Sequence, residues 1–434
     1  MIRIFFLFTL FIFIFSCSLN KNSKFWTSSK NINIDNNEFT EKIIVKESAI
    51  NKEFNSNIRV ILKSNISEQD SINPYYNFYG RNNFDSKLQK SSRYRFTKIK
   101  NFYQFEPEVS INEKNIIFFD DKGSILQFDE NSNLVWKKNY YTKSEKKLKP
   151  ILQFSNNKEF LIVADNLAKY YLLDLKSGNL IWSKDNLAPF NSQIKIYKDK
   201  FFIIDFSNTL RCFSLKNGEE LWNIKTENTL IKSQKKLSIV IIKDQVIFNN
   251  SIGDISAVNL NRGELLWQLP TQSSAVYESA FSLETSEIIT DGKTLFFSNN
   301  NNQLFSINIE TASINWENKV NSSLRSALLE NYLFSISLEG YLIVTEVNSG
   351  NIIRITDVFS NFKKNKRSKV KPTGFVVGLN KIYVSTNIGR LLIVDIASGQ
   401  TITTLKIDNE KIAQPFIIDE ELFVIKDNAI IKLN

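Results

Sequence analysis

The residue types that most often carry catalysis are scarce in this chain. None of its 434 residues is histidine, which excludes Ser/His and Cys/His catalytic arrangements and most zinc and haem sites. The only two cysteines are Cys17 and Cys212. No phosphate-binding glycine loop, nucleophile elbow or metal-spaced ligand cluster is present in the sequence. We therefore expect a protein that is not an enzyme and that has no catalytic residue, cofactor site or metal site.

Two further features have structural explanations. Cys212 stands in the run Leu-Arg-Cys-Phe and is interpreted as a small apolar residue of a strand. Asp174 and Asp395 occupy the same place in two copies of a repeated phrase. An acid that recurs in this way is more simply a turn residue than a catalytic one, because its side chain can accept hydrogen bonds from the turn backbone.

The first residues combine a short positive start with an apolar run. Arg3 precedes Ile4 to Phe15, which is apolar except for Thr9. A run of this length is too short to cross a bilayer and is typical of a signal peptide. The run ends in Ile-Phe-Ser-Cys, which resembles the bacterial lipobox, although Phe15 departs from its usual small or aliphatic residue. We expect residues 1–16 to be a signal peptide and Cys17 to be lipidated; a chance cysteine after an ordinary signal peptide is the alternative.

The resemblance to lipoproteins also has implications for location. Ser18, which stands where an aspartate would retain the protein at the inner membrane, implies sorting to the outer membrane. Residues 17–91 are expected to form a lipidated tether followed by a segment without a clear assignment. Within that segment, 42–45 and 59–62 read as short strands with no obvious partners.

The chain is basic, with a formal net charge of +10. The densest cluster is 363–371, with the sequence Lys-Lys-Asn-Lys-Arg-Ser-Lys-Val-Lys. Such a run is usually a solvated loop, and the alternative is contact with an anionic surface or an acidic partner. Because no helix or stacking platform accompanies it, we do not expect nucleic-acid binding.

From about residue 107 onward, one phrase recurs: an alternating strand, a turn, and a strand bearing Trp. In three copies Trp follows a turn glycine by four residues, as in Gly178 and Trp182. Marker positions then recur at intervals of 38 to 49 residues: Trp136, Trp182, Trp222, Trp267, Trp316, Arg354 and Thr403. This period, with four short strands per unit, is typical of a β-propeller blade. We expect each Trp to pack between adjacent blades.

Seven complete units leave three strands at the end of the chain. These are 415–418, 421–425 and 429–433, and the alternating segment 94–99 precedes the first unit. Pairing this segment with the last three strands would remove an open sheet edge. The sequence therefore predicts an all-β fold: an eight-bladed propeller over residues 92–434, with four antiparallel strands per blade and the last blade closed by both termini.

The Gly-x-x-x-Trp phrase resembles the pyrroloquinoline-quinone (PQQ) type of propeller repeat. Together with the lipobox and the blade count, it resembles the BamB family of outer-membrane β-barrel assembly lipoproteins. Two segments extend the resemblance. The run Leu230-Ile231-Lys232 is similar to the family's Leu-x-Leu-Arg loop, and Leu283-Glu284 is similar to an Asp-x-Asp loop of which one acid is kept. The alternative is that both are ordinary connections between blades.

The resemblance implies a non-enzymatic scaffold on the periplasmic face of the outer membrane, anchored through its N-terminal lipid. By the same resemblance, the two loops would bind BamA, the barrel-inserting subunit, and unpaired blade edges would pair with nascent outer-membrane proteins. One alternative is a propeller that binds another envelope partner. A quinoprotein dehydrogenase is the less favoured alternative, since the vicinal cysteine pair that many of these enzymes carry is absent.

Overall fold

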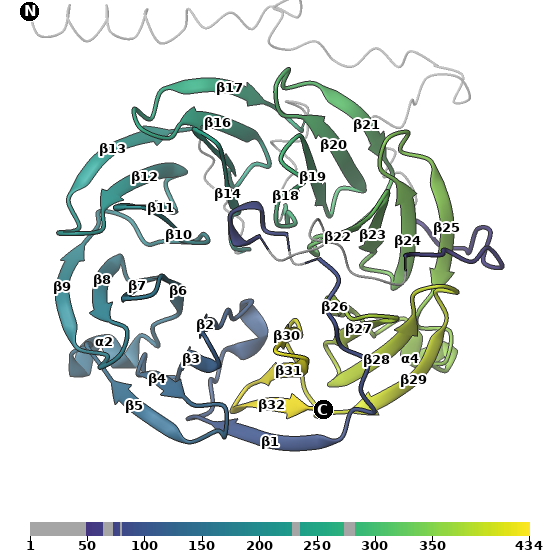
Figure 1. Ribbon diagram of the computed structural model, residues 1–434, viewed down its shortest axis with the longest axis horizontal. Coiled ribbons are helices and arrows are strands. Elements are labelled where there is room, and N and C mark those ends of the chain that lie inside the picture. The colour runs from purple at the N-terminus through teal and green to yellow at the C-terminus, as the bar shows by residue number, and fades with distance from the viewer. Residues whose placement is uncertain (1–48, 64–72, 79, 228–234, 273–282) are drawn as a thin grey trace, which may run out of the picture. The chain divides into compact units, whose positions relative to one another are not determined.

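The computed structural model describes residues 49–63, 73–78, 80–227, 235–272 and 283–434. These residues build eight four-stranded antiparallel sheets, which stand around a central channel as the blades of a propeller (Figure 1). The predicted fold is therefore confirmed. Within the described ranges, no helix is long and apolar enough to cross a membrane.

The strands of each blade follow one another outward from the channel. In blades one to four they are β2 (Ser110–Asn112), β3 (Asn115–Phe119), β4 (Ile125–Phe128), β5 (Leu134–Lys138); β6 (Leu152–Asn156), β7 (Phe160–Asp165), β8 (Lys169–Asp174), β9 (Leu180–Asp185); β10 (Lys195–Tyr197), β11 (Lys200–Ile204), β12 (Thr209–Ser214), β13 (Glu220–Lys225); and β14 (Ile239–Ile242), β15 (Gln245–Asn249), β16 (Ile255–Asn259), β17 (Leu265–Leu269).

Blades five to seven repeat the order. Their strands are β18 (Ile289–Thr290), β19 (Thr294–Asn299), β20 (Gln303–Asn308), β21 (Ile314–Asn318); β22 (Ala327–Leu329), β23 (Tyr332–Ile336), β24 (Tyr341–Glu346), β25 (Ile352–Asp357); and β26 (Pro372–Val377), β27 (Lys381–Thr386), β28 (Arg390–Asp395), β29 (Thr401–Lys406). Short helices lie between blades: η3 (Phe102–Gln104), α2 (Lys143–Lys147) and α4 (Lys364–Arg367).

Blade eight is assembled from both ends of the propeller, as predicted. Its inner three strands are β30 (Phe416–Ile418), β31 (Glu421–Lys426) and β32 (Ala429–Leu433), and β1 (Lys90–Arg95) pairs with β32 on the outside. The bounds of the closing strand were predicted wrongly. It ends at Arg95 rather than residue 99, because Phe96 and Ile99 leave the sheet and are buried in the core.

The marker tryptophans join neighbouring blades, which confirms their predicted place. In blades one to seven, each turn before an outer strand has a residue with positive φ, and in four of these turns the Trp of the preceding blade lies against that residue. At Gly263, with φ +70°, an added Cβ would stand 2.5 Å from the Trp222 ring. At this turn glycine suits the contact both by its backbone conformation and by its lack of a side chain. The equivalent turns of blades one and five have Ser132 and Ala312 instead, also with positive φ. Gly178, Gly218 and Gly350 receive Trp136, Trp182 and Trp316 in the same way.

Blade six departs from this rule, because its marker position is Arg354. The side chain is fully buried, and it packs against the turn at Gly399, as a tryptophan would. Its guanidinium donates hydrogen bonds to three backbone oxygens: Ile396 at 2.9 Å, Ile58 at 3.0 Å and Ala397. Ile58 belongs to the segment that precedes the propeller repeats, so the arginine ties that segment to the ring.

We call residues 49–63, 73–78 and 80–89 the N-terminal strap. Its first part pairs with the outer edge of blade six, where Phe54 and Ile355 exchange backbone hydrogen bonds of 3.1 and 2.8 Å. The run 59–62, expected as a short strand, is not one. Instead Val60 is buried, and its N–H donates to the Ala397 oxygen at 2.9 Å. The other expected strand, 42–45, lies outside the described residues.

The second part of the strap enters the central channel (Figure 1). It contains η2 (Pro74–Tyr76), and the buried Asn77 amide nitrogen lies 3.0 Å from Gln193 Oε1 and 2.9 Å from the Ile288 oxygen. Lys195 Nζ donates to Asn77 Oδ1 at 2.6 Å and to the Pro74 oxygen at 2.5 Å. These contacts link the inner parts of blades three and five.

The third part of the strap crosses blade seven and leads into β1. Arg81 Nε donates to the Leu379 oxygen at 2.7 Å, and the Asn82 N–H donates to the Val377 oxygen at 3.1 Å. Phe84 is buried against Tyr383, with ring centroids 5.3 Å apart. The region that had no clear assignment in the sequence is thus packed on the propeller wherever the structure describes it.

We predict that Arg354→Met loosens the strap at blade six. The change leaves three backbone oxygens without their guanidinium donor, which should lower the free energy of unfolding by about 2 kcal/mol. The backbone amides of Phe54 and Val60 should exchange hydrogen faster than in the wild type, and they should exchange before the amides of the blade strands. Arg262→Met serves as the control, since that side chain is 75% exposed and should change stability by less than about 0.5 kcal/mol. Unchanged exchange in the strap would contradict the role given to Arg354.

We predict a pH-dependent contribution from Lys195. Burial lowers the pKa of this lysine from 10.5 to about 8. The folded state therefore binds fewer protons than the unfolded state between these values, and stability rises with pH across this window. Between pH 8 and 10.5, the free energy of unfolding of the wild-type protein should rise by about 3 kcal/mol relative to that of Lys195→Met. Denaturant unfolding of both proteins at each pH measures this difference. The contribution of titrating tyrosines cancels in the comparison, because both proteins contain the same tyrosines. A constant difference would show that the lysine titrates normally.

Candidate functional site

Every connection from an outer strand to the next inner strand begins and ends on one face of the propeller. This follows from the uniform order of the blades, because each outer strand ends at the face where the next inner strand begins. We call it the connection face, and the opposite face, which carries the turns before the second and fourth strands, the turn face. Both loops singled out in the sequence are connections of this kind: 226–238 leads from β13 to β14, and 270–288 leads from β17 to β18.

The first loop is described only at its two ends. Leu230, Ile231 and Lys232 lie outside the described residues, as does Cys17. The end of the loop is fixed by two lysines. Lys235 forms an ion pair with Glu106 at 3.1 Å, and Lys236 forms one with Glu108 at 2.7 Å.

The second loop places its two singled-out residues differently. Leu283 is 4% exposed and packs against Gly253, so its side chain contacts the interior of this chain. Glu284 is exposed, and its backbone exchanges hydrogen bonds with Asn300: the Asn300 side chain accepts from the Glu284 N–H at 3.0 Å. Of these two residues, only Glu284 is exposed and can contact a partner.

The two loops meet at Ser323, in the connection from blade five to blade six. Ser323 Oγ donates to Glu284 Oε2 at 3.0 Å, and the Ser323 backbone oxygen accepts a hydrogen bond from Lys235 Nζ. One residue thus bridges the ends of two loops that the sequence separates by about fifty positions. Sequence reasoning did not identify Ser323, Glu106 or Glu108, and no motif marks them.

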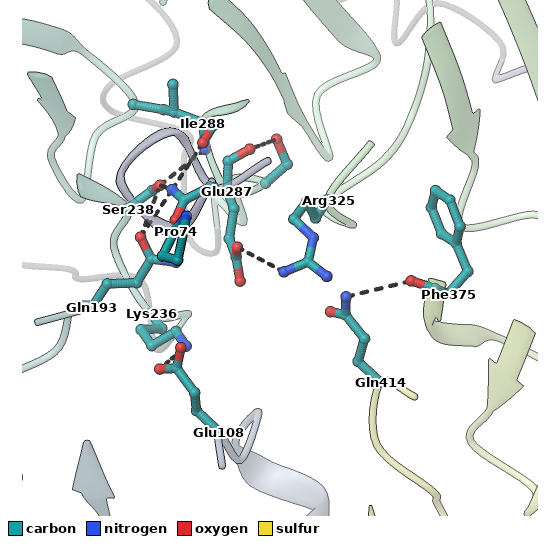
Figure 2. Close-up of polar contacts among 12 residues, drawn as sticks. Pro74, Glu108, Gln193, Lys236, Ser238, Glu287, Ile288, Arg325, Phe375 and Gln414 are labelled. Carbon is teal, nitrogen blue, oxygen red and sulfur yellow. Dashed lines mark hydrogen bonds and ion pairs between the residues drawn. The ribbon is translucent and has the colours of Figure 1, made fainter. Parts of the chain in front are cut away.

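The central channel opens beside this meeting point. It holds a cavity of about 840 Å³, lined by inner strands and by the strap residues Pro74 and Tyr75. Charged side chains gather where the connections lead into the inner strands. Glu287 lies 3.2 Å from Arg325, and Glu108 faces Lys236 (Figure 2).

These charges stabilise one another in spite of their burial. Burial by itself would raise the pKa of Glu287, but the positive charges of Arg325, Lys236 and Lys195 outweigh it and lower the pKa. Burial would lower the pKa of Lys236, but Glu108 and Glu287 raise it. Burial does lower the pKa of Lys411, which donates to the Phe105 oxygen at 3.1 Å. The opposite charges at the mouth of the channel therefore favour the ionised forms of Glu287 and Lys236.

The remaining candidates for chemistry have structural roles, as expected. Cys212 lies fully buried in β12 without a disulfide partner, and burial raises the pKa of its thiol to about 12. Asp174 accepts a hydrogen bond from the Ser177 N–H at 2.7 Å, and Asp395 accepts one from the Ser398 N–H at 2.6 Å. In the described part of the chain, no group of three or more Cys, Asp or Glu side chains is placed to hold a metal ion.

The repeats that build the blades match a known protein family. The model of outer membrane protein assembly factor BamB matches residues 121–356, which is more than half of the chain. BamB of Moranella endobia is 20% identical over 277 residues, covering 62% of this chain and 68% of that protein. An uncharacterized protein of Rickettsia prowazekii is 21% identical over 328 residues, covering 64% of this chain and 77% of that protein.

Solved structures share the propeller fold. BamB from Moraxella catarrhalis superposes with a TM-score of 0.65 at 15% identity, covering 80% of this chain and 99% of that chain. The quinohemoprotein alcohol dehydrogenase of Comamonas testosteroni superposes with a TM-score of 0.62 at 9% identity, covering 83% of this chain and 79% of that chain. At these identities both likenesses show the fold alone. The family match rests instead on the repeats of blades one to six, and by that match the chain belongs to the BamB family of outer membrane protein assembly factors.

Proposed function

We propose that this protein is a non-enzymatic scaffold lipoprotein of the outer-membrane β-barrel assembly machinery. The observation that carries the proposal is the convergence of the two family-like loops at Ser323 on the connection face. A BamA-like subunit would bind there, with Leu230, Ile231 and Lys232 as one contact and Glu284 as the other. Leu283 would support Glu284 from the core rather than touch the partner.

The same proposal includes the location of the protein. Residues 1–16 would direct export, and acyl chains on Cys17 would hold the protein at the periplasmic side of the outer membrane. Residues 17–48 would tether that anchor to the strap. Membership in the BamB family supports this location.

A scaffold role also agrees with the channel. In the dehydrogenase alternative, the channel of the propeller would have to hold a quinone. Here η2 and Asn77 of the strap occupy part of it, and the charged side chains at its mouth are already paired with one another. The side chains inside the channel are therefore better explained as contacts that join the blades than as a reaction site.

The outer edges of the blades support a second contact, with nascent outer-membrane proteins. Apolar side chains are exposed on the outer strands of six blades: Leu134, Val135, Leu180, Ile181, Leu221, Leu265, Leu266, Ile314 and Ile402. In blade six the corresponding Ile352 and Ile353 are half-buried, because the strap pairs with that edge at Phe54. In the described ranges, no other segment outside the blades pairs with an outer strand. The blade-six contact shows how an extended segment can add to such an edge.

We predict that Lys232→Glu and Glu284→Lys each weaken the binding of a BamA-like subunit about tenfold, because each reverses a charge in the proposed contact. The measurement is affinity purification of the solubilised lipoprotein, with partners identified by mass spectrometry and affinities measured on the partner's periplasmic domains. Lys216→Glu, on the turn face, is the control and should bind normally. Unchanged binding by both variants would remove the loops from the contact. If no subunit of the barrel assembly machinery is recovered, the propeller binds another envelope partner instead.

We predict that a photo-crosslinking residue at Ile181 or Leu266 captures unfolded barrel substrates, whereas one at Ile353 captures few, since the strap covers that edge. The crosslinked products are mapped by mass spectrometry in cells that synthesise outer-membrane proteins. Two results would contradict binding of substrates by the outer edges. One is that substrate crosslinks arise only from the connections, and the other is that Ile353 gives as many crosslinks as Ile181 and Leu266.

A further inference from the structure

The connection from blade six to blade seven carries the basic run noted in the sequence. It contains α4, and five of its lysines are exposed: Lys363, Lys364, Lys366, Lys369 and Lys371. Like charges this close repel one another. A connection that keeps them together in one fixed place therefore needs other contacts that hold it.

The sixth cation of the run, Arg367, supplies the first of these contacts. Its guanidinium donates twice to the Asp357 carboxylate, at 2.8 and 3.0 Å. The same group lies 5.3 Å from the centre of the Tyr341 ring and 5.6 Å from that of Phe359. Two parallel hydrogen bonds and two ring faces fix the arginine in place.

Asn387 supplies the second contact, from the neighbouring blade. Its side chain accepts from the Lys371 N–H at 2.8 Å and donates to the Lys369 oxygen at 3.1 Å. Between these two bonds, Val370 is 1% exposed. The backbone is thus held on both sides of Val370, while the lysine side chains on either side point outward into solvent.

The composition of this surface selects the kind of ligand. In the described part of the chain, none of the five lysines forms an ion pair. The connection offers no exposed apolar anchor, since Val358, Phe359 and Val370 are buried and Phe362 is half-buried. Protein partners usually need such an anchor. Lysine, a hydrated point charge, suits a diffuse layer of negative charge better than a bidentate contact.

We propose that this connection binds the anionic phospholipid head groups of a bilayer surface. The choice of a bilayer over an acidic protein rests on the missing apolar anchor and on the proposed lipid anchorage of the chain. The surface lies on the connection face, in the connection that follows the one containing Ser323. A protein anchored at Cys17 would thereby gain a second, reversible membrane contact that depends on charge.

The test uses residues 18–434, which keep every described element of the closed ring and lack the acylation site. Binding is measured by flotation with vesicles of phosphatidylcholine, with and without phosphatidylglycerol. We expect binding only to the anionic vesicles, and its loss at high salt. Lys364→Gln combined with Lys366→Gln should weaken it at least tenfold, since each lysine near the surface contributes separately, roughly fivefold.

The matched control is Lys176→Gln combined with Lys216→Gln. Both of these lysines are exposed on the turn face, so the control changes the net charge equally. The control should bind as the wild type does, and the melting temperatures of both double variants should equal that of the parent. Equal weakening in both variants would show attraction by net charge alone and overturn the proposal, as would absence of binding by the parent. Because this assay contains no partner protein, its outcome is independent of the BamA purification.

Discussion

The contact between a tryptophan and the turn of the next blade is the interaction on which the ring depends. Each blade buries its strands between two neighbours, so the angle and distance between blades must repeat closely. A turn residue with positive φ lets the chain fold back tightly, and in four turns the missing glycine side chain leaves space for the indole ring. At each of these four glycines a Cβ atom would stand less than 3 Å from the tryptophan side chain, so these turns do not tolerate one without a shift. Closure of blade eight by β1 then leaves no blade without neighbours on both sides.

The exception at Arg354 shows how a repeat position can acquire a new role. An arginine can fill the space of the indole and also donate hydrogen bonds, so blade six holds its neighbour and the strap with one side chain. The strap in turn enters the channel, where Asn77 and Lys195 link blades that are not adjacent. The channel is therefore part of what keeps the ring rigid, at the cost of burying a lysine.

The two faces of the ring differ in what they can bind. On the turn face the hairpin turns are short, and the strap runs along blades six and seven. The connection face carries the longer segments. There the ends of two loops are joined through Ser323 of a third connection, while a fourth connection displays its lysines. A partner subunit and a membrane surface could thus be bound at separate connections of one rigid disc. Rigidity matters here, because a scaffold positions its partners only as well as its own blades are fixed.

The sequence by itself determined the fold. The spacing of Trp182 and its equivalents, the turn glycines and the three unmatched strands at the end of the chain are local patterns, and each predicts its element without knowledge of distant contacts. Tertiary structure alone decided the strap and the meeting of the loops. Arg354 reads as a lost tryptophan, and only the fold shows that it reaches Ile58, which is 296 residues away. Ser323 has no motif, and its role comes from the place where three connections converge. Such contacts form once in the chain, so they leave no periodic signal, and they exist only where the fold brings segments that are distant in sequence together.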